Sequence, residues 1–286
     1  MDNFPEETSQ PTHAGAKRVV PNALWRRASD AYWWWRNRGN HQIAALLHPR
    51  LRRDRNRLNA YRNRHEGERC FIIGNGPSLK KTDLSLLNNE ISFGMNRIYL
   101  MFEELGFPTT YFIAINTLVI EQCESEIQAL SIPKFLTWRS REWMSGDPGT
   151  IFVDTDYRGI ESFSNNLTGR IFEGGTVTYV ALQAAYWMGF QEVILVGVDH
   201  SYSTKGPANA TVVSQIEDPN HFDPDYFGRG FRWQLPDLEA AERSFRLARD
   251  AFEADGRKVV DATVGGLLEV FPKVKYRSLF LRQGDS

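Results

Sequence analysis

The fold of this chain is indicated by "FIIGNGPSLKKTDLSLL", residues Phe71 to Leu87. The stretch begins with an apolar run typical of a buried strand, passes through a turn with two glycines, and continues into a helix-length segment. Glycine lets the main chain approach a neighbouring group closely, and proline followed by serine suits the first turn of a helix. The stretch therefore predicts a strand, a tight turn and a helix in direct succession.

Similar apolar runs recur along the chain and alternate with amphipathic, helix-length segments. The apolar runs are 70–74, 91–95, 110–115, 134–138, 192–198 and 257–262, and the helix-length segments are 98–106, 117–130, 176–188 and 237–255. Strands that are apolar on both faces and separated by helices are typical of a parallel sheet covered on both sides. We therefore predict an α/β fold with a doubly wound, Rossmann-like, mostly parallel sheet.

The region before this sheet has a different composition. Residues 17–64 contain thirteen Lys and Arg against two acids, whereas the whole chain of 286 residues has a net charge of −1. Tryptophan and tyrosine are mixed with the arginines, which is typical of helices that lie on an anionic membrane surface. Packing of this basic segment on the main domain is the alternative. Nucleic acid is not an expected partner, because basic charge alone is weak evidence for it.

The composition also limits the domain organisation and the location. Two cysteines make neither a disulfide framework nor a CxxC metal site, and no apolar stretch is long enough to span a membrane. We expect a cytoplasmic protein, peripheral on the inner face of the membrane and able to form a homo-oligomer. The predicted parts are a disordered tail at 1–16, a basic, aromatic-rich helical extension at 17–66, and a nucleotide-binding catalytic domain at 67–286.

The glycine-containing turn predicts a phosphate site. In an open parallel sheet, ligands bind beyond the carboxyl ends of the strands, and the first strand–turn–helix presents backbone N–H groups to an anion. A tight structural turn is the alternative, because the spacing matches neither the dinucleotide fingerprint nor the P-loop. The predicted nucleotide-binding residues of the turn are Gly74, Asn75, Gly76, Pro77 and Ser78.

Asparagines follow the next two apolar runs, Asn96 in "GMNR" and Asn116 in "AINT". Three successive strands would then each place an asparagine at one edge of the sheet. An amide side chain can donate to a phosphate and accept from a ribose or a base, without a metal. A local role in a turn or a helix cap is the alternative for each asparagine.

A second strand–helix unit lies in "EGGTVTYVALQAAYWMGFQEVILVGVDHSY", residues 173–202. Gly174, Gly175 and Thr176 begin a helix whose N-terminus points to the same edge, and we expect them to bind the nucleotide. Asp199 and Tyr202 follow the next strand and are predicted at that edge as well. Asp199 could instead cap the following loop. The stretch 201–235 lacks periodicity and is predicted to be a long loop or lid.

These motifs together resemble a known family. "IIGNGPSL", "MNR", the stretch 173–202 and "HFDPDYFG" resemble the Maf-type flagellin glycosyltransferases and 6-hydroxymethylpterin diphosphokinase-like proteins, which in turn resemble the sialyltransferases of glycosyltransferase family 42. The resemblance covers about residues 68–280 and implies a GT-A-like variant of the Rossmann-like fold. It implies that the turn and Asn75, Asn96 and Asn116 bind a CMP-sugar donor.

The resemblance also implies the catalytic residues. Tyr202 would hold the leaving phosphate, and His221 in the lid would be the general base. The chain departs from the family pattern because "STKGPANA" lacks a second tyrosine, for which Tyr226 is a candidate substitute. His200 is the alternative catalytic histidine.

The expected function is a metal-independent glycosyl transfer in cell-surface glycan biosynthesis. A nonulosonic acid, sialic acid-like or Kdo-like, would move from CMP to a hydroxyl of a glycan or lipid-linked acceptor, without a cofactor. An imidazole with a pKa of about 6.5 suits a general base at neutral pH. His221 lies between two acids, Asp218 and Asp223, that could orient it.

Two other functions stay open. The first is pyrophosphoryl transfer from ATP to a pterin, which would need Mg²⁺ and a carboxylate pair, Asp199 with Asp154 or Asp156 of "VDTD". The second is a nucleotide-binding module without catalysis, which would need the turn but not His221.

Overall fold

A parallel eight-stranded sheet lies at the centre of the computed structural model, which describes residues 48–144, 147–159 and 161–281. The strand order is β10-β7-β1-β2-β3-β4-β5-β6, and every neighbouring pair is parallel. The strands of this sheet are β1 (Arg69–Ile73), β2 (Ser92–Met95), β3 (Tyr111–Ala114), β4 (Lys134–Thr137), β5 (Thr150–Asp156), β6 (Arg170–Phe172), β7 (Glu192–Val196) and β10 (Lys258–Asp261). The predicted doubly wound, Rossmann-like α/β fold is confirmed.

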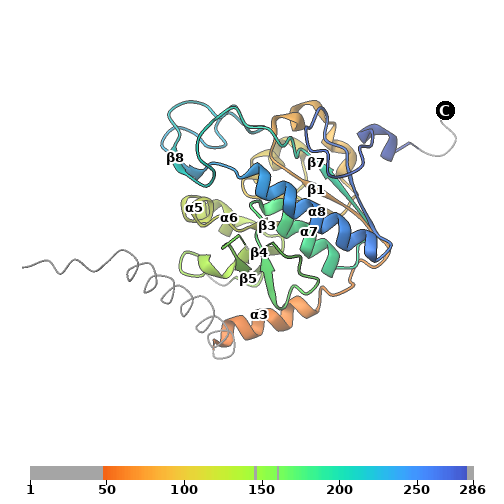
Figure 1. Cartoon of the computed structure of the whole chain (residues 1–286). Helices are drawn as coiled ribbons and strands as arrows, with labels where there is room; N and C mark the ends of the chain where they lie inside the picture. The colour runs from red at the N-terminus through yellow and green to blue at the C-terminus, as the bar shows by residue number, and fades with distance from the viewer. Residues whose placement is uncertain (1–47, 145–146, 160, 282–286) are drawn as a thin grey trace, which may run out of the picture. The chain divides into compact units, whose positions relative to one another are not determined.

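Helices connect the strands and cover both faces of the sheet (Figure 1). The α-helices are α3 (Pro49–Asn59), α4 (Phe102–Leu105), α5 (Thr117–Gln122), α6 (Glu124–Ala129), α7 (Val177–Trp187) and α8 (Leu238–Ala254), and the 3₁₀ helices are η2 (Pro77–Lys81), η3 (Leu84–Leu87), η4 (Ile98–Met101), η5 (Trp138–Ser140) and η6 (Tyr276–Leu279). The single helix predicted at 117–130 is divided at Cys123 into α5 and α6. β5 and β6 were not predicted as strands.

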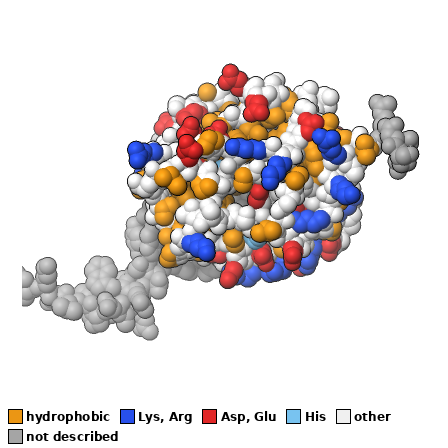
Figure 2. Space-filling view, turned by 90° about the horizontal axis from the view of Figure 1, so that it is seen from above, with side chains coloured by type: hydrophobic (Ala, Val, Ile, Leu, Met, Phe, Trp, Pro, Cys, Tyr) orange, Lys and Arg blue, Asp and Glu red, His pale blue; other side chains and the backbone are white. Residues whose placement is uncertain are grey.

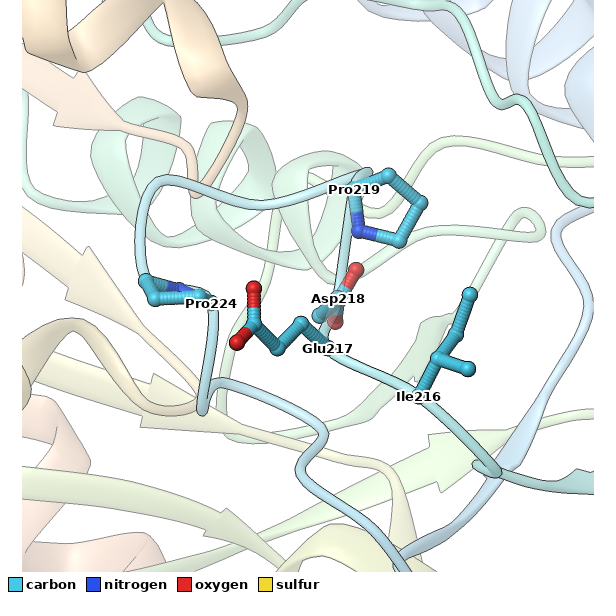
Figure 3. Close-up of a pocket in the computed structure, with 5 residues that line it drawn as sticks. All are labelled: Ile216, Glu217, Asp218, Pro219 and Pro224. Atoms are coloured by element: carbon cyan, nitrogen blue, oxygen red, sulfur yellow. The ribbon is translucent and has the colours of Figure 1, made fainter.

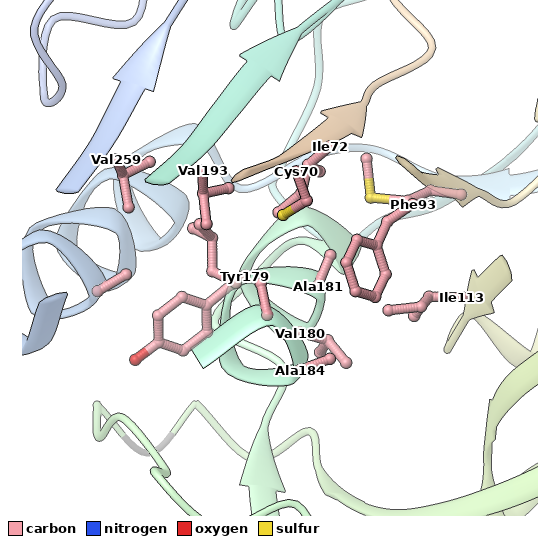
Figure 4. Packing of buried hydrophobic residues seen from close by; sticks show 14 of the residues in the cluster. Cys70, Ile72, Phe93, Ile113, Tyr179, Val180, Ala181, Ala184, Val193 and Val259 are labelled. Carbon is pink, nitrogen blue, oxygen red and sulfur yellow. The ribbon is translucent and has the colours of Figure 1, made fainter. Parts of the chain in front are cut away.

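The core lies between one face of the sheet and the helices α7 and α8. Figure 4 shows Cys70 and Ile72 of β1, with Phe93 of β2, packed over Val180 and Ala184 of α7, and all five are buried. Side chains alternate between the two faces of a strand, so Phe71 points to the opposite face, where it stacks on Phe280 at 5.7 Å between ring centroids. Both faces of β1 are therefore buried, as its continuous apolar sequence predicted.

The order of the strands reverses beside β1. After β1 the chain adds β2 to β5 one after another on one side and then β6, whereas β7 returns to the other side of β1. The carboxyl ends of β1 and β7 flank the crevice at such a reversal, which is where ligands bind in open α/β sheets. Asn75, Asn96 and Asn116 follow the adjacent strands β1, β2 and β3, as predicted.

The helix α3 covers the part of the β5 edge that does not pair with β6. β6 pairs only with Asp154–Asp156 of β5, so the first half of β5 has no strand on that side among the described residues. Asp54 of α3 accepts from the N–H of Phe152 at 3.3 Å, and Arg57 donates to the carbonyl of Thr150 at 2.7 Å. Covering an exposed sheet edge with a helix protects it from pairing with other chains. The burial of Asp54 follows from this role.

The segment 201–235 contains a small second sheet. Its strands β8 (Thr211–Val213) and β9 (Arg232–Gln234) pair antiparallel, and the rest of the segment is irregular. Gln122 of α5 makes two hydrogen bonds with the main chain of β9. Its Nε2 donates to the carbonyl of Arg232 at 2.8 Å, and its Oε1 accepts from the Arg232 N–H at 2.9 Å. The predicted lid is thus attached to the sheet domain, and "the lid" below means residues 201–235.

The chain divides into two compact units, Met1–His48 and Pro49–Ser286. The predicted tail at 1–16 and residues 17–47 of the predicted basic extension lie outside the described residues. Residues 49–66, which the sequence assigned to that extension, belong to the second unit and include α3. Within the described part of the chain, no helix is both long and apolar enough to cross a bilayer. On the face seen in Figure 2, acidic and basic side chains are interspersed with hydrophobic ones.

Candidate functional site

The turn after β1 packs tightly against the segment that follows β7. Gly74 donates its N–H to Val196 at 2.7 Å, and Gly76 donates to Gly197 at 2.9 Å. A Cβ atom at Gly74 would overlap the carbonyl oxygen of Gly197. Glycine is therefore required here for close contact between two parts of the main chain.

Asp199 caps the short helix η2 that follows this turn. Its carboxylate accepts from the backbone N–H of Ser78 at 3.1 Å and from the Ser78 hydroxyl at 2.6 Å. Burial raises the pKa of Asp199, and the two bonds from Ser78 oppose that rise. The N–H groups of Gly74, Gly76 and Ser78 are thus all engaged within the protein. Binding of a phosphate by the turn stays a prediction, and in this conformation these three N–H groups are not open to it.

Two of the three asparagines leave a buried acceptor atom at the edge of the sheet. Asn75 donates its amide to the carbonyl of Met95 at 3.1 Å, and Asn96 has a left-handed backbone with φ of 51°. The Oδ1 atoms of both side chains are buried without a partner among the described residues. Asn116 differs, because its Oδ1 accepts from the N–H of Leu118 at 3.0 Å and caps α5. The site therefore offers two acceptors to a ligand that carries hydrogen-bond donors.

The lid is bonded to the ends of β1 and β2. Phe222 donates its N–H to the carbonyl of Asn75 at 2.9 Å. Arg97, which directly follows Asn96, donates through its guanidinium to the carbonyl of Asp225 at 2.9 Å and to that of Tyr226. The hydroxyl of Tyr226 accepts from the Arg97 N–H at 3.3 Å. The strand ends and the lid thus form one continuous site.

His221 is oriented by two side chains of the lid. Its Nδ1 lies 2.7 Å from Oδ2 of Asp218, and its ring stacks on Tyr226 with centroids 4.0 Å apart and an angle of 9°. The side chains of His221 and Asp218 are 9% and 2% exposed. In a neutral imidazole, a carboxylate acceptor at Nδ1 places the hydrogen on Nδ1 and the lone pair on Nε2, which is the form that a general base requires. Asp223, the other acid beside His221 in the sequence, instead accepts from the N–H of Asp225.

Tyr202 meets His221 edge to face, with ring centroids 6.0 Å apart. Burial raises the pKa of Tyr202 to about 12, and the nearby carboxylates of Asp218 and Asp199 add to the rise. The hydroxyl therefore keeps its proton at neutral pH and can donate it in a hydrogen bond. Tyr202 and His221 both belong to the lid and lie nineteen residues apart in the sequence, so the fold of the lid brings the two rings together.

The two alternative catalytic residues lie differently. His200 has φ of 55° and contacts Glu242 of α8, with Nε2 and Oε1 3.2 Å apart. Tyr226 is fully buried beneath His221, and its hydroxyl is engaged by Arg97. His200 therefore contacts α8, and Tyr226 packs against the imidazole ring of His221.

The glycines before α7 pack against α8. A Cβ atom at Gly174 would overlap the side chain of Ser244, and one at Gly175 would crowd the main chain of Ala241. Thr176 caps α7 by accepting from the N–H of Thr178 at 3.3 Å. These contacts account for the two glycines through helix packing and for Thr176 through helix capping. Their contact with a nucleotide stays a prediction.

The predicted carboxylate pair for Mg²⁺ is not assembled. Five strand spacings separate β7 from β5, which is roughly 24 Å at about 4.8 Å per strand. Asp156 is bound by Arg158, and Asp154 lies 3.6 Å from Arg170. Asp199 therefore cannot join Asp154 or Asp156 in one site. Among the described residues, no three His, Cys, Asp or Glu side chains gather where they could hold a metal ion.

A hollow of about 560 Å³ lies on the lid beside the Asp218–His221 pair (Figure 3). Its lining residues are Ile216, Glu217, Asp218, Pro219 and Pro224. Asp218 lines the hollow and also contacts His221, and its N–H donates to the carbonyl of Pro224 at 2.7 Å, which closes the loop. Asp218 thus lies in the wall of a surface depression, although its own side chain is only 2% exposed.

The sequence did not single out Arg97, which bonds the lid to the end of β2, or Asn220, which bonds two parts of the lid to each other. Arg97 was quoted within "MNR" without a role, although it bonds the lid. Asn220 accepts from the N–H of Ser203 at 2.7 Å and donates to the hydroxyl of Thr204 at 3.0 Å. No local pattern marks either residue, because each contact joins segments far apart in the sequence.

Comparison with known proteins gives a family and one similar structure. The structure is that of the Maf glycosyltransferase from Magnetospirillum magneticum AMB-1, with 15% sequence identity and a TM-score of 0.49. The match covers 82% of this chain but only 39% of that one, so the chain spans well under half the length of that protein. A search of curated proteins found no match. The profile of the family described as 6-hydroxymethylpterin diphosphokinase MptE-like matches residues 47–205, more than half of the chain, and the protein therefore belongs to the MptE-like family.

Proposed function

We propose that this protein is a glycosyltransferase that moves a nonulosonic acid, sialic acid-like or Kdo-like, from a CMP-activated donor to a hydroxyl of a glycan or lipid-linked acceptor. The observation that carries the proposal is the Asp218–His221 pair, which lies with Tyr202 over the ends of β1 and β2. A histidine oriented by a carboxylate and placed beside a protonated tyrosine suits a reaction in which one hydroxyl loses a proton and a phosphate leaves.

The residues take separate roles in the proposed reaction. Nε2 of His221 accepts the proton of the acceptor hydroxyl while that oxygen bonds to the anomeric carbon of the donor sugar. The bond between this carbon and the phosphate oxygen breaks, and the electron pair leaves with CMP. Tyr202 donates a hydrogen bond to the leaving phosphate, and Asp218 stabilises the imidazolium that forms.

The asparagines supply the proposed nucleotide recognition. The Oδ1 atoms of Asn75 and Asn96, which have no partner in the part of the chain that the structure describes, are acceptors, so they fit the hydroxyls of a ribose or the amino group of a cytosine. An unpartnered buried acceptor costs free energy, and a ligand that supplies a donor removes that cost. The two amide oxygens thus favour the nucleoside part of the CMP-sugar as their partner. The phosphate would instead bind hydrogen-bond donors such as the Tyr202 hydroxyl.

The carboxylates favour a reaction that does not require a metal. Asp199 is engaged by Ser78, and Asp154 and Asp156 are paired with arginines at a distant part of the sheet. A Mg²⁺ ion that bridges phosphates normally takes one or two carboxylates. Under this proposal the leaving phosphate is stabilised by hydrogen-bond donors alone.

A second candidate is pyrophosphoryl transfer from ATP, and the family description favours it. The matched residues 47–205 include Asn75, Asn96 and Tyr202 but end before His221. Both candidates would use a nucleotide site at these residues, whereas the proposed general base lies outside the matched part. A non-catalytic nucleotide-binding module is a third candidate, and it would need the turn and the asparagines only.

Thermal unfolding with added nucleotides separates these candidates. A ligand that binds only the folded state raises the melting temperature by mass action. We expect CMP to raise the melting temperature of the full-length chain in the presence of EDTA. A rise with ATP and Mg²⁺ but none with CMP would replace the proposal with the diphosphokinase reaction. A rise with CMP, together with absent hydrolysis and transfer of CMP-sugars, would favour the non-catalytic module.

A further inference from the structure

A second polar cluster lies at the carboxyl edge of the sheet, at the ends of β4, β5 and β6. Glu173 follows β6 and accepts from the Thr155 hydroxyl at 2.6 Å. Arg139 follows β4, and its Nη2 atom donates both to Glu173 and, at 3.4 Å, to the carbonyl of Ile115. This Arg139–Glu173 cluster has no part in the reaction proposed above, although the same edge of the sheet carries it.

Two features of the cluster point to a ligand. Nε of Arg139 is buried and has no hydrogen-bond partner among the described residues. The ring of Tyr157 lies over the Arg139 guanidinium, with 4.5 Å between Cζ and the ring centroid, although 43% of Tyr157 is exposed. A buried donor without a partner is unfavourable in a folded protein, and an exposed aromatic ring offers a flat apolar surface. The cluster thus combines an unused donor with a partly exposed aromatic ring.

The charges around the cluster are balanced. Three guanidinium groups face three carboxylates, and the members are Arg139, Arg158, Arg170, Asp154, Asp156 and Glu173. An anionic ligand would meet the carboxylates, and a cationic ligand would meet the guanidinium groups. A neutral ligand is repelled by neither set of charges. If it carries many hydroxyls, these can both donate to carboxylates and accept from guanidinium N–H groups.

We propose that Arg139, Tyr157 and Glu173 form a subsite for a neutral, hydroxyl-rich sugar of the acceptor glycan. The sugar ring stacks on Tyr157, while its hydroxyls bond to the Arg139 guanidinium and the Glu173 carboxylate. This subsite rests on the proposed glycosyltransferase function, since it assigns the part of the surface that holds the acceptor.

The position of the subsite determines what it can do. Three strand spacings separate β4 from β1, which is roughly 14 Å. The sugar bound there is consequently remote from the hydroxyl that reacts at His221. Its contribution is to the affinity for acceptors longer than one sugar, and not to proton transfer.

Binding of sugars to the full-length protein tests the subsite without requiring turnover. The probes are a panel of neutral mono-, di- and trisaccharides, followed by saturation-transfer NMR and titration calorimetry. At least one member should bind the wild type, and Tyr157→Ala should weaken that binding about ten-fold through loss of the stacking surface. Tyr157→Phe keeps the ring and should bind nearly as the wild type does. No binding by the wild type, or equal binding by Tyr157→Ala, would overturn the subsite.

Arginine variants provide the second comparison. Arg139→Gln should weaken sugar binding about ten-fold because a charged donor is removed. Arg141→Gln is the matched control, because Arg141 also lies over an aromatic ring, that of Trp138, but outside the cluster. The double variant Arg139→Gln/Glu173→Gln avoids leaving a buried unpaired carboxylate, and it should fold yet still bind sugar weakly. Sugar binding at the wild-type level by a folded double variant would contradict the assignment.

CMP binding, measured on the same samples, separates the subsite from the reaction. We expect Tyr157→Ala and Arg139→Gln to bind CMP as the wild type does, since the nucleotide site lies near β1. Sugar binding without CMP binding would refute the proposed donor and leave a carbohydrate site. CMP binding without sugar binding would refute the subsite and leave the donor site.

Discussion

Single residues of the lid would set the chemistry of the proposed site. Asp218 fixes the direction of the His221 ring, and Tyr226 supports it from below. His200, one residue after Asp199, is instead held by Glu242. The two histidines are thus distinguished by their partners, because only His221 lies beside Tyr202 and the ends of β1 and β2.

Substitution of the histidines tests this distinction. His221→Ala should lower kcat by roughly 10²–10⁴ and leave CMP affinity nearly unchanged, because the imidazole acts on the acceptor hydroxyl. His200→Ala should keep most of the activity, since it loses only a contact with α8. The measurements are transfer from a CMP-sugar and CMP titration calorimetry. An active His221→Ala with an inactive His200→Ala would reverse the two assignments.

Further variants at the site should separate binding from chemistry. Tyr202→Phe removes a donor to the leaving phosphate and should slow transfer by a factor on the order of 10². Asn75→Ala removes an acceptor from the nucleotide site and should appear in KM and in the thermal shift with CMP. Equal losses of CMP binding in both variants would contradict the separate roles.

The buried carboxyl of Glu173 gives a prediction for pH. Burial raises the pKa of Glu173 above its ordinary value of 4.5, and Arg139 and Thr155 oppose the rise. Between these two pKa values the unfolded chain has released its proton while the folded protein still holds it, so stability falls as pH increases through that window. Glu173→Gln does not titrate, and its stability relative to the wild type should improve as pH rises from 4 to 7. Urea unfolding at several pH values measures the difference, and a difference independent of pH would contradict the prediction.

At the scale of elements, α3 and the lid cover parts of the sheet that no neighbouring strand covers among the described residues. α3 supplies the side chains that pair with the unpaired edge of β5, and the lid covers the turns after β1 and β2. Neither contact is local in sequence. Asp54 and Phe152 are separated by almost one hundred residues, and so are the other groups that join α3 to β5.

Loss of the Asp54 carboxylate tests the role of α3. Asp54→Ala leaves the N–H of Phe152 without an acceptor and Arg57 without its carboxylate, so the free energy of unfolding should fall by about 3 kcal/mol. Asp54→Asn keeps an acceptor oxygen and should cost less. Asp250→Ala is the control, because Asp250 is exposed and pairs only with its neighbour Arg249 in the contacts described. Urea unfolding of the three variants checks this order, and an Asp54→Ala variant as stable as the control would contradict it.

At the scale of the whole molecule, the basic charge of the chain is concentrated before the sheet. Of the thirteen Lys and Arg at 17–64, six lie before the compact unit that begins at Pro49 and seven lie inside it. We propose a functional division in which the segment before Pro49 binds an anionic surface and the second unit carries the proposed nucleotide site. Membrane attachment through this segment stays a prediction.

Vesicle binding tests this division. Deletion of residues 1–48 leaves α3 and its contacts with β5 in place, whereas deletion of 1–64 would remove them. The full chain should co-sediment with vesicles that contain anionic lipid, at about 1 kcal/mol per basic residue near the surface, and less at high salt. The 49–286 chain should sediment much less and still bind CMP. Equal sedimentation of both chains would refute attachment through the N-terminal segment.

The sequence by itself determined the sheet, and it predicted the edge of the sheet at which the proposed site lies. Six apolar runs became six parallel strands with their ends within two residues of the prediction, because strands buried on both faces must be apolar throughout. The asparagines at the ends of β1, β2 and β3 could be placed at one edge because parallel strands end on the same side. The same reasoning missed β5 and β6. Their sequences contain Asp154, Asp156 and Arg170, charged residues that the fold pairs with one another.

Tertiary structure alone decided which of the predicted residues work together. Asp199 binds Ser78 instead of standing free, Asn116 caps a helix, and the two aspartates of β5 lie far from the turn. His221 reaches the strand ends because the lid bonds to Asn75 and Arg97 across more than one hundred residues. The physical reason is that hydrophobic periodicity is a local property of a sequence, whereas the partner of a polar side chain depends on which segments the folded chain brings within hydrogen-bond distance.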